Sequence, residues 1–141
     1  MLSRWAEYLD NVSTVLLIDD SRFLRRANEL SLAKAGHKIL TASDGEEGLR
    51  LAREKKPDVI VLDMMLPKLG GAQLLQLLKG EPMTAKIPVI VLSSLPQKNE
   101  LKLISEGAAA YLEKSSLALD QCSSELSRII TKVLASVPAT I

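Results

Sequence analysis

Three short runs of the sequence are apolar at every position, and they constrain the fold more than any other feature. They are residues 15–18 (VLLI), 59–62 (VIVL) and 89–92 (VIVL). A strand that faces water on one side alternates apolar and polar residues, so uninterrupted runs are typical of strands buried on both faces. Parallel sheets that carry helices on both sides contain such strands. The runs therefore predict a buried parallel sheet between helical layers.

Two further strands and five amphipathic stretches complete an alternating pattern. The strands are expected at 38–41 and 109–112. The helices are expected from Phe23 to a cap at Gly36, from Asp44 with Glu47 completing a capping box, and over about 71–80, 97–106 and 119–134. This alternation predicts an α/β fold, a flavodoxin-like three-layer αβα sandwich whose five parallel strands follow the order 2-1-3-4-5.

The pattern defines one domain over residues 14–135, which suits a chain of 141 residues. Residues 1–13 form an N-terminal extension, and residues 136–141 form a C-terminal tail. Four apolar residues of the extension fit one helical face: Leu2, Trp5, Leu9 and Val12. The extension is therefore either a short extra helix or a linker without structure of its own.

Composition excludes several classes of protein. The 18 basic and 17 acidic residues nearly cancel, for a net charge of +1, whereas nucleic-acid binders show a basic surplus. No apolar run approaches the length of a membrane span, and Glu7 and Asp10 stand where a signal peptide needs apolar residues. The single cysteine, Cys122, forms no internal disulfide and agrees with a reducing compartment. We expect a cytoplasmic protein without direct nucleic-acid or membrane contact.

Polar residues follow the predicted strands at the edge of the sheet where ligands of open α/β sheets bind. Asp19 and Asp20 follow the first strand, Asp63 the third, Ser93 the fourth, and Glu113 and Lys114 the fifth. The predicted strand order places Asp63 in the centre, between the acidic pair and Ser93. Taken alone, each residue has a simpler interpretation, such as a helix cap for Asp20 or Ser21 and a surface position for Lys114. Their joint placement at strand ends favours a shared site.

The chemistry of this set follows from its charges. Three carboxylates held close together repel one another, so they require cations nearby. Mg²⁺ prefers hard oxygen ligands, and an ammonium group would supply further positive charge. A carboxylate is also a nucleophile that forms an aspartyl phosphate, and phosphoryl transfer needs mainly positioning and charge neutralisation. The set therefore predicts Mg²⁺-dependent phosphoryl transfer to a carboxylate.

Four segments together closely resemble the receiver domain of two-component response regulators. They are residues 15–21 (VLLIDDS), 61–67 (VLDMMLP), 87–94 (IPVIVLSS) and 107–114 (GAAAYLEK), and the match extends over about residues 14–134. Each segment is a weak signal, but four in order at the expected spacing are highly specific. The resemblance implies a CheY-like fold.

The resemblance also implies a role for each site residue. Asp63 would be the phosphoacceptor. Asp20 and Asp63 would ligate Mg²⁺ directly, together with the backbone carbonyl of Met65, and Asp19 would act mostly through metal-bound water. Lys114 would pair with the phosphoryl oxygens.

The same resemblance predicts a switch. Ser93 would hydrogen-bond the phosphoryl group and move toward it, and Tyr111 would change its rotamer in response. Two departures from the family pattern stand out. Ser115 replaces the proline that usually follows the lysine, and apolar Met65 and Leu95 occupy positions that influence the attack of water on the phosphoryl group.

The resulting hypothesis is a signalling switch rather than an enzyme. Its partners would be a sensor histidine kinase or histidine phosphotransfer protein and a downstream effector. A homodimer through the fourth helix, fifth strand and fifth helix of the alternation is also considered. One alternative is a receiver-like module that works without phosphorylation, which only Ser115 favours. Another is a phosphohydrolase of the haloacid-dehalogenase kind, which Met65 argues against because such enzymes carry a second Asp there.

Three further charged or titratable residues are assigned no role in the predicted site. Arg25 and Arg26 are interpreted as a solvated helix face. His37 is interpreted as a structural or solvated residue in a turn.

Overall fold

The computed structural model describes residues 13–64, 66, 69–93, 100–113 and 119–136, with residues 100–101 and 119–123 described as backbone only. Within these ranges strands and helices alternate along the chain. The strands are β1 (Thr14–Ile18), β2 (Lys38–Ala42), β3 (Val59–Asp63), β4 (Val89–Ser93) and β5 (Ala110–Glu113). The helices are α2 (Arg22–Lys34), α3 (Gly45–Lys55), α4 (Gly71–Gly80), α5 (Glu100–Ser105) and α6 (Leu119–Ser136).

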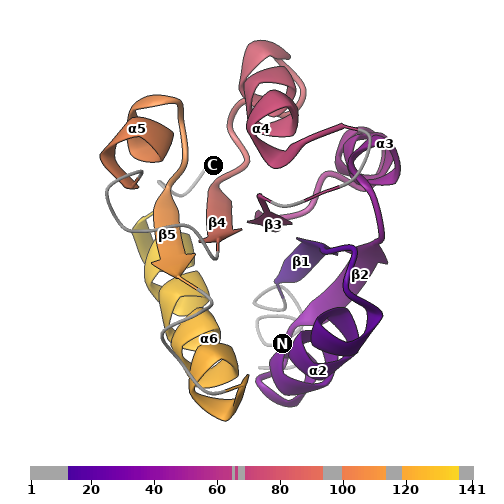
Figure 1. The fold of residues 1–141 in the computed structure, drawn as a ribbon, viewed down its shortest axis with the longest axis vertical. Coiled ribbons are helices and arrows are strands. Elements are labelled where there is room, and N and C mark those ends of the chain that lie inside the picture. The colour runs from indigo at the N-terminus through magenta and orange to yellow at the C-terminus, as the bar shows by residue number, and fades with distance from the viewer. Residues whose placement is uncertain (1–12, 65, 67–68, 94–99, 114–118, 137–141) are drawn as a thin grey trace, which may run out of the picture.

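The five strands form one parallel sheet in the order β2-β1-β3-β4-β5. Helices α3, α4 and α5 cover one face of the sheet, and α2 and α6 cover the other (Figure 1). The predicted strand order and the flavodoxin-like sandwich are thereby confirmed.

Two separate hydrophobic cores explain why the central strands lack polar positions. Alternate residues, such as Leu16 and Ile60, pack under α3, α4 and α5. The residues between them, such as Leu17 and Val61, pack under α2 and α6. Because successive side chains of a strand point to opposite faces, a strand covered on both sides needs apolar residues throughout. Full burial of one such side chain stabilises the fold by about 1.5–3 kcal/mol.

Local signals set the ends of the first two helices. Ser21 caps α2, since its Oγ accepts a hydrogen bond from the backbone N of Leu24 at 3.3 Å. Asp44 caps α3 by accepting from the backbone N of Glu47 at 2.8 Å, which confirms the first half of the predicted capping box. Gly36 has φ of 96°, a left-handed conformation that glycine adopts without strain, and it ends α2 as predicted.

Several predicted boundaries differ from the structure by one or two residues. The fifth strand occupies Ala110–Glu113 instead of 109–112. Helix α5 covers Glu100–Ser105, and the preceding residues of the predicted 97–106 helix lie outside the described ranges. Helix α6 continues to Ser136, one residue beyond the predicted domain end. Residues 1–12 of the predicted extension are not described. Among the described helices, none has the length and apolar character needed to cross a bilayer.

Candidate functional site

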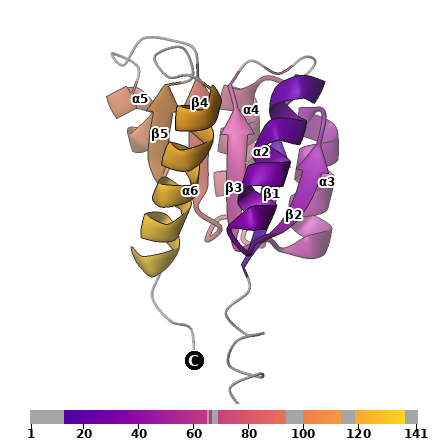
Figure 2. The same ribbon diagram turned by 90° about the horizontal axis from the view of Figure 1, so that it is seen from below.

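The register of the sheet brings the predicted site residues to one edge. Ile18 pairs with Leu62, so Asp19 and Asp63 are the next residues on the adjacent strand ends. Asp63 in turn pairs with Leu92, directly before Ser93. The strands all point to the same end of the molecule, which is the upper end in Figure 2. Parallel strand order thus gathers residues that lie far apart in the sequence.

Three carboxylates form a cluster at this edge. Asp19, Asp20 and Asp63 each offer one oxygen, and these oxygens lie within 4.8 Å of one another. Asp19 is 0% exposed and Asp63 is 3% exposed, whereas Asp20 is open to solvent. Like charges this close raise the free energy of the cation-free state. A set of hard oxygen donors partly open to solvent fits a divalent cation that keeps some of its water.

Hydrogen bonds fix Asp19 from three directions. Its backbone N donates to the carbonyl of Ala42 at 3.1 Å, and its Oδ1 accepts from the backbone N of Ser21 at 2.9 Å. Its carbonyl oxygen accepts from Nη1 of Arg25 at 2.8 Å. The backbone of Asp19 is therefore tied to β2 and to the first turn of α2.

The contact of Arg25 corrects the interpretation of Arg25 and Arg26 as a solvated pair. Arg26 is exposed and forms an ion pair with Glu29 at 3.1 Å, as expected for a solvated face. Arg25 is only partly exposed and places its guanidinium against the strand end that carries Asp19. The sequence offered one signal for this contact. Arg25 stands four residues after the cap Ser21, and residues four apart lie on one side of a helix, so its side chain can reach back to the residues before the helix.

The capping interpretation of Asp20 is excluded by the geometry of α2. Ser21 is the N-cap, and its own side chain satisfies the backbone N of Leu24. The carboxylate of Asp20 belongs instead to the acidic cluster.

A glycine supports the end of β3. A Cβ atom added to Gly71 would lie 2.6 Å from Cα of Met64 and 2.9 Å from the carbonyl oxygen of Asp63. Only a residue without a side chain lets the first turn of α4 approach the backbone of Asp63 so closely. The sequence pattern predicts only that the helix over about 71–80 starts near Gly71. Close approach between backbones leaves no direct signal in a single sequence.

The two predicted switch residues lie on neighbouring strands. Ser93 is 0% exposed at the end of β4, and Tyr111 is partly buried on β5, paired with Val91. Tyr111 packs against the core that contains Val91, and side chains two apart on a strand share a face. Ser93 and Tyr111 therefore lie on the same side of the sheet.

Several predicted residues fall outside the described part of the chain. They are Met65, Leu95, Lys114 and Ser115. The roles predicted for Asp63 as phosphoacceptor and for Ser93 and Tyr111 as switch residues stay predictions.

Comparison with known proteins identifies the family. Residues 15–123 match the response regulator receiver domain. The chain is 38% identical over 102 residues to the transcriptional regulatory protein AfsQ1 of Streptomyces coelicolor, covering 72% of this chain and 44% of AfsQ1. It is 35% identical over 104 residues to the protein PilH of Pseudomonas aeruginosa, covering 73% of this chain and 86% of PilH.

Solved structures agree with this assignment. The receiver domain of the Francisella response regulator 1452 superimposes with a TM-score of 0.79 at 28% identity, covering 89% of this chain and 99% of that one. The response regulator domain of Thermotoga maritima CheB gives a TM-score of 0.77 at 30% identity, covering 91% of this chain and 100% of that one. The chain spans less than half of AfsQ1 and 15% of the gliding motility regulatory protein of Myxococcus xanthus. The chain itself belongs to the response regulator receiver domain family.

Proposed function

We propose that this receiver domain accepts a phosphoryl group on Asp63 in a Mg²⁺-dependent reaction and switches a protein-binding face in response. The observation that carries the proposal is the cluster of Asp19, Asp20 and Asp63 at the carboxyl edge of the sheet, with donor oxygens within 4.8 Å. Asp63 ends β3, the middle strand of the sheet, so Asp19 lies at the end of the neighbouring strand on one side and Ser93 at the end of the neighbouring strand on the other.

The carboxylates of Asp19, Asp20 and Asp63 and the backbone carbonyl of Met65 would hold the cation. When bound, Mg²⁺ supplies positive charge that offsets the carboxylates and the phosphoryl oxygens. The bonds from Ser21 and Arg25 hold Asp19 in place beside the other two carboxylates. We expect Asp20 and Asp63 to matter more for affinity than Asp19, because two carboxylates would contact the ion directly and the third would act through water.

The proposed transfer is a displacement at phosphorus. A carboxylate oxygen of Asp63 attacks the phosphorus atom of a phosphohistidine, and the bond from phosphorus to the histidine nitrogen breaks with its electron pair on that nitrogen. Ser93 would donate its hydroxyl to a phosphoryl oxygen, and Lys114 would pair with another. A sensor histidine kinase or a histidine phosphotransfer protein would be the donor, and the reaction would take place in the cytoplasm.

The proposed output runs through β5. Movement of Ser93 toward the phosphoryl group would vacate space on the side of the sheet where Tyr111 lies. Tyr111 also lines a surface hollow between α5, β5 and α6, together with Ile104, Glu125 and Ile129. This α5-β5-α6 face corresponds to the fourth helix, fifth strand and fifth helix of the sequence pattern. It would bind a downstream effector or a second copy of the chain, and the domain itself would act as a switch rather than as an enzyme.

The test of the phosphoacceptor is intact mass after incubation with acetyl phosphate and Mg²⁺. Wild type should gain one phosphoryl group, and Asp63→Asn should gain none. Asp58→Asn is the matched control, because Asp58 is an exposed carboxylate whose contact to the backbone N of Thr14 an amide oxygen preserves. Equal labelling of wild type and Asp63→Asn would contradict the assignment. A wild type that takes no label would favour a module that works without phosphorylation.

A second measurement tests the switch. Beryllofluoride mimics a phosphoryl group, and its addition should change amide exchange in β4, β5 and α6 more than in β2. Changes confined to the acidic cluster would leave a domain that binds phosphate but does not switch.

The phosphorylated form should be long-lived, and Met65→Asn should shorten its lifetime by giving the attacking water a polar group to orient it.

A further inference from the structure

Asp20 is held differently from the other two carboxylates of the acidic cluster. Asp63 ends β3 and is 3% exposed, and Asp19 is buried and bonds through its backbone N to the carbonyl of Ala42 at 3.1 Å. Asp20 is open to solvent and lies between the end of β1 and Ser21, the cap of α2. Its position therefore depends on the two peptide groups that flank it.

Hydrogen bonds fix both of these peptide groups. The group that joins Asp19 to Asp20 accepts at its carbonyl oxygen from Nη1 of Arg25 at 2.8 Å. The group that joins Asp20 to Ser21 donates its N–H to Oδ1 of Asp19 at 2.9 Å. Because a peptide group is planar, a bond that fixes one of its atoms also restricts the direction of the next Cα. The two bonds together restrict where Cα of Asp20 can lie.

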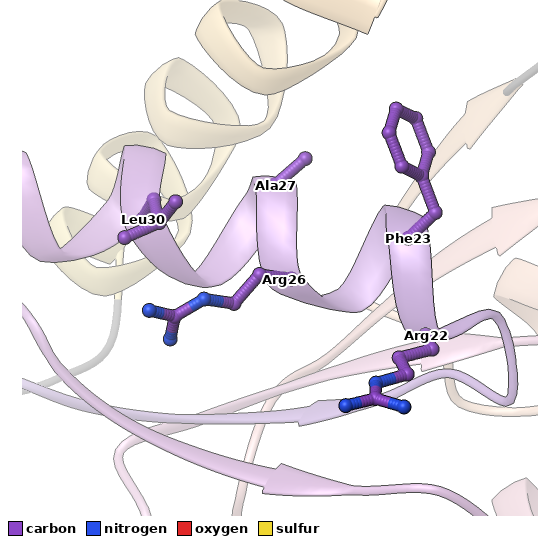
Figure 3. Close-up of a pocket in the computed structure, with 5 residues that line it drawn as sticks. All are labelled: Arg22, Phe23, Arg26, Ala27 and Leu30. Carbon is purple, nitrogen blue, oxygen red and sulfur yellow. The ribbon is translucent and has the colours of Figure 1, made fainter.

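Arg25 differs from the other two arginines in the first turns of α2. Arg22 and Arg26 line a shallow surface hollow and extend to the same side of the helix (Figure 3). Both are exposed, and Arg26 pairs with Glu29 at 3.1 Å. Arg25 is only partly exposed, and its planar guanidinium lies against the strand end that precedes Asp20. Of these three arginines, Arg25 is the one placed to act on the acidic cluster.

We propose that Arg25 is a positioning residue for metal binding, which sets the affinity of the cluster for Mg²⁺ by fixing the peptide group between Asp19 and Asp20. It acts through the position of the Asp20 carboxylate and is not itself a ligand. This role rests on the proposed binding of Mg²⁺ by the cluster. Residues that orient metal ligands typically change the affinity by about tenfold or more.

The charge of Arg25 acts on Mg²⁺ in the opposite direction from its hydrogen bond. A guanidinium beside three carboxylates offsets part of their repulsion, and by the same interaction it repels a divalent cation. Solvent and salt screen that repulsion, because Arg25 is partly exposed. The hydrogen bond is not screened in this way, so the positioning effect should exceed the charge effect. Loss of Arg25 should therefore weaken Mg²⁺ binding, whereas a purely electrostatic role would strengthen it.

The sign of this change is measured in NMR titrations with Mg²⁺ at constant ionic strength. Arg25→Met keeps an unbranched apolar stem and removes the donors and the charge, and it should raise the dissociation constant about tenfold. Arg22→Met is the matched control, because Arg22 is exposed on the same helix, and it should not raise the constant. A lower dissociation constant in Arg25→Met would overturn the proposal, as would an equal rise in both variants.

A double variant tests whether the effect passes through Asp20. In Asp20→Asn the binding of Mg²⁺ is already weakened, and adding Arg25→Met should weaken it further by no more than about twofold, because both substitutions affect the same ligand. A further loss as large as in the wild-type background would overturn the assignment to Asp20.

Amide hydrogen exchange without metal separates this role from the proposed function. Arg25→Met should lower the protection of the Ser21 amide several-fold, while the amides of β3 and β4 keep their protection, and Arg22→Met should change neither. An unchanged Ser21 amide would overturn the proposal, as would a loss of protection throughout β3 and β4. A wild type that binds no Mg²⁺ would contradict the proposed function, and the exchange of the Ser21 amide would still decide whether Arg25 positions this peptide group.

Discussion

The central and the edge strands of this sheet are built differently. Every residue of β3 and β4 is buried, whereas β2 and β5 each have a single buried residue. The acidic cluster and Ser93 extend from the ends of central strands, and Tyr111 lies on an edge strand. A fully buried strand gives the carboxylates a rigid support, whereas a strand with one buried residue leaves room around Tyr111, the residue proposed to change its rotamer. The fold therefore places the proposed phosphoacceptor and the proposed switch tyrosine on strands that are packed differently.

The hydrogen bonds of the two regions agree with this difference. Asp63 ends β3 and Asp19 directly follows β1, two strands that are bonded to neighbours on both sides. Asp19 gains further bonds from Ser21 and Arg25. Among the described residues, β5 lies at the edge of the sheet and pairs with β4 alone. Local opening is expected to cost less free energy at such an edge than at the centre.

The largest expected effect on the free energy of unfolding comes from truncating a buried side chain on a central strand. Ile60 is fully buried in β3, and Ile60→Ala should lower the free energy of unfolding by about 3–4 kcal/mol, because it loses burial and leaves a cavity. The same substitution at Ile39, which is partly buried on β2, should cost about 1 kcal/mol. Urea unfolding followed by circular dichroism measures both. Equal losses would mean that the edge strand is as tightly packed as the centre.

The second effect concerns the backbone approach at the end of β3. Gly71→Ala should lower the free energy of unfolding by about 1–3 kcal/mol, since the added Cβ meets backbone atoms of Met64 and Asp63. It should also weaken Mg²⁺ binding in calorimetry, because Asp63 has to move. Gly80→Ala, in the same helix, is the control: no atom of the described residues lies within 4 Å of its added Cβ, and it should stabilise the fold by about 0.5 kcal/mol. A Gly71→Ala variant with wild-type Mg²⁺ affinity would contradict the close support of Asp63.

The sequence was sufficient to predict the central part of the fold and the acids of the site. Uninterrupted apolar runs indicated the buried strands, and the residues directly after them, Asp19, Asp20 and Asp63, proved to lie together. Strand order was predictable because few arrangements of alternating strands and helices are common.

Other features required the structure, for physical reasons. Arg25 donates its hydrogen bond to a backbone carbonyl, which every residue has, so the sequence does not indicate the partner. Gly71 matters because it has no Cβ atom that would clash with the backbone of Met64 and Asp63, and a single sequence does not show that approach. The apolar spacing on α2 predicted a helix but not which apolar residues face the core: Leu32 is buried and Phe23 is exposed. Periodicity identifies a face, whereas the packing of neighbouring elements decides which face is covered.

A third, smaller effect separates charge repulsion from helix capping at the end of β1. In the absence of metal, Asp20→Asn should raise the free energy of unfolding by up to about 1 kcal/mol, because one of three clustered charges is removed. Ser21→Ala should lower it by about 1 kcal/mol through loss of the cap on α2. Adding Mg²⁺ should stabilise wild type more than Asp20→Asn, since a ligand that binds only the folded state adds to its stability. A lower urea midpoint for metal-free Asp20→Asn would indicate that this carboxylate supports the fold in another way.

The smallest effect is expected at the start of the edge strand β2, where partly buried His37 follows the turn after α2. Burial lowers the pKa of the His37 imidazole below its ordinary value, because the charged form loses hydration. The unfolded chain therefore binds a proton at a higher pH than the folded chain, and stability falls as the pH drops below about 6.5. The loss is complete once the pH is below the folded pKa, and solvent screening of this partly exposed group should limit it to a fall in Tm on the order of 1 °C. Calorimetry between about pH 7.5 and pH 5.5, above the range where carboxylates titrate, measures it, and His37→Gln should remove this part of the slope. A slope several times larger would mean that the start of β2 is as closed to solvent as the central strands, and an unchanged slope in His37→Gln would assign the titration to another group.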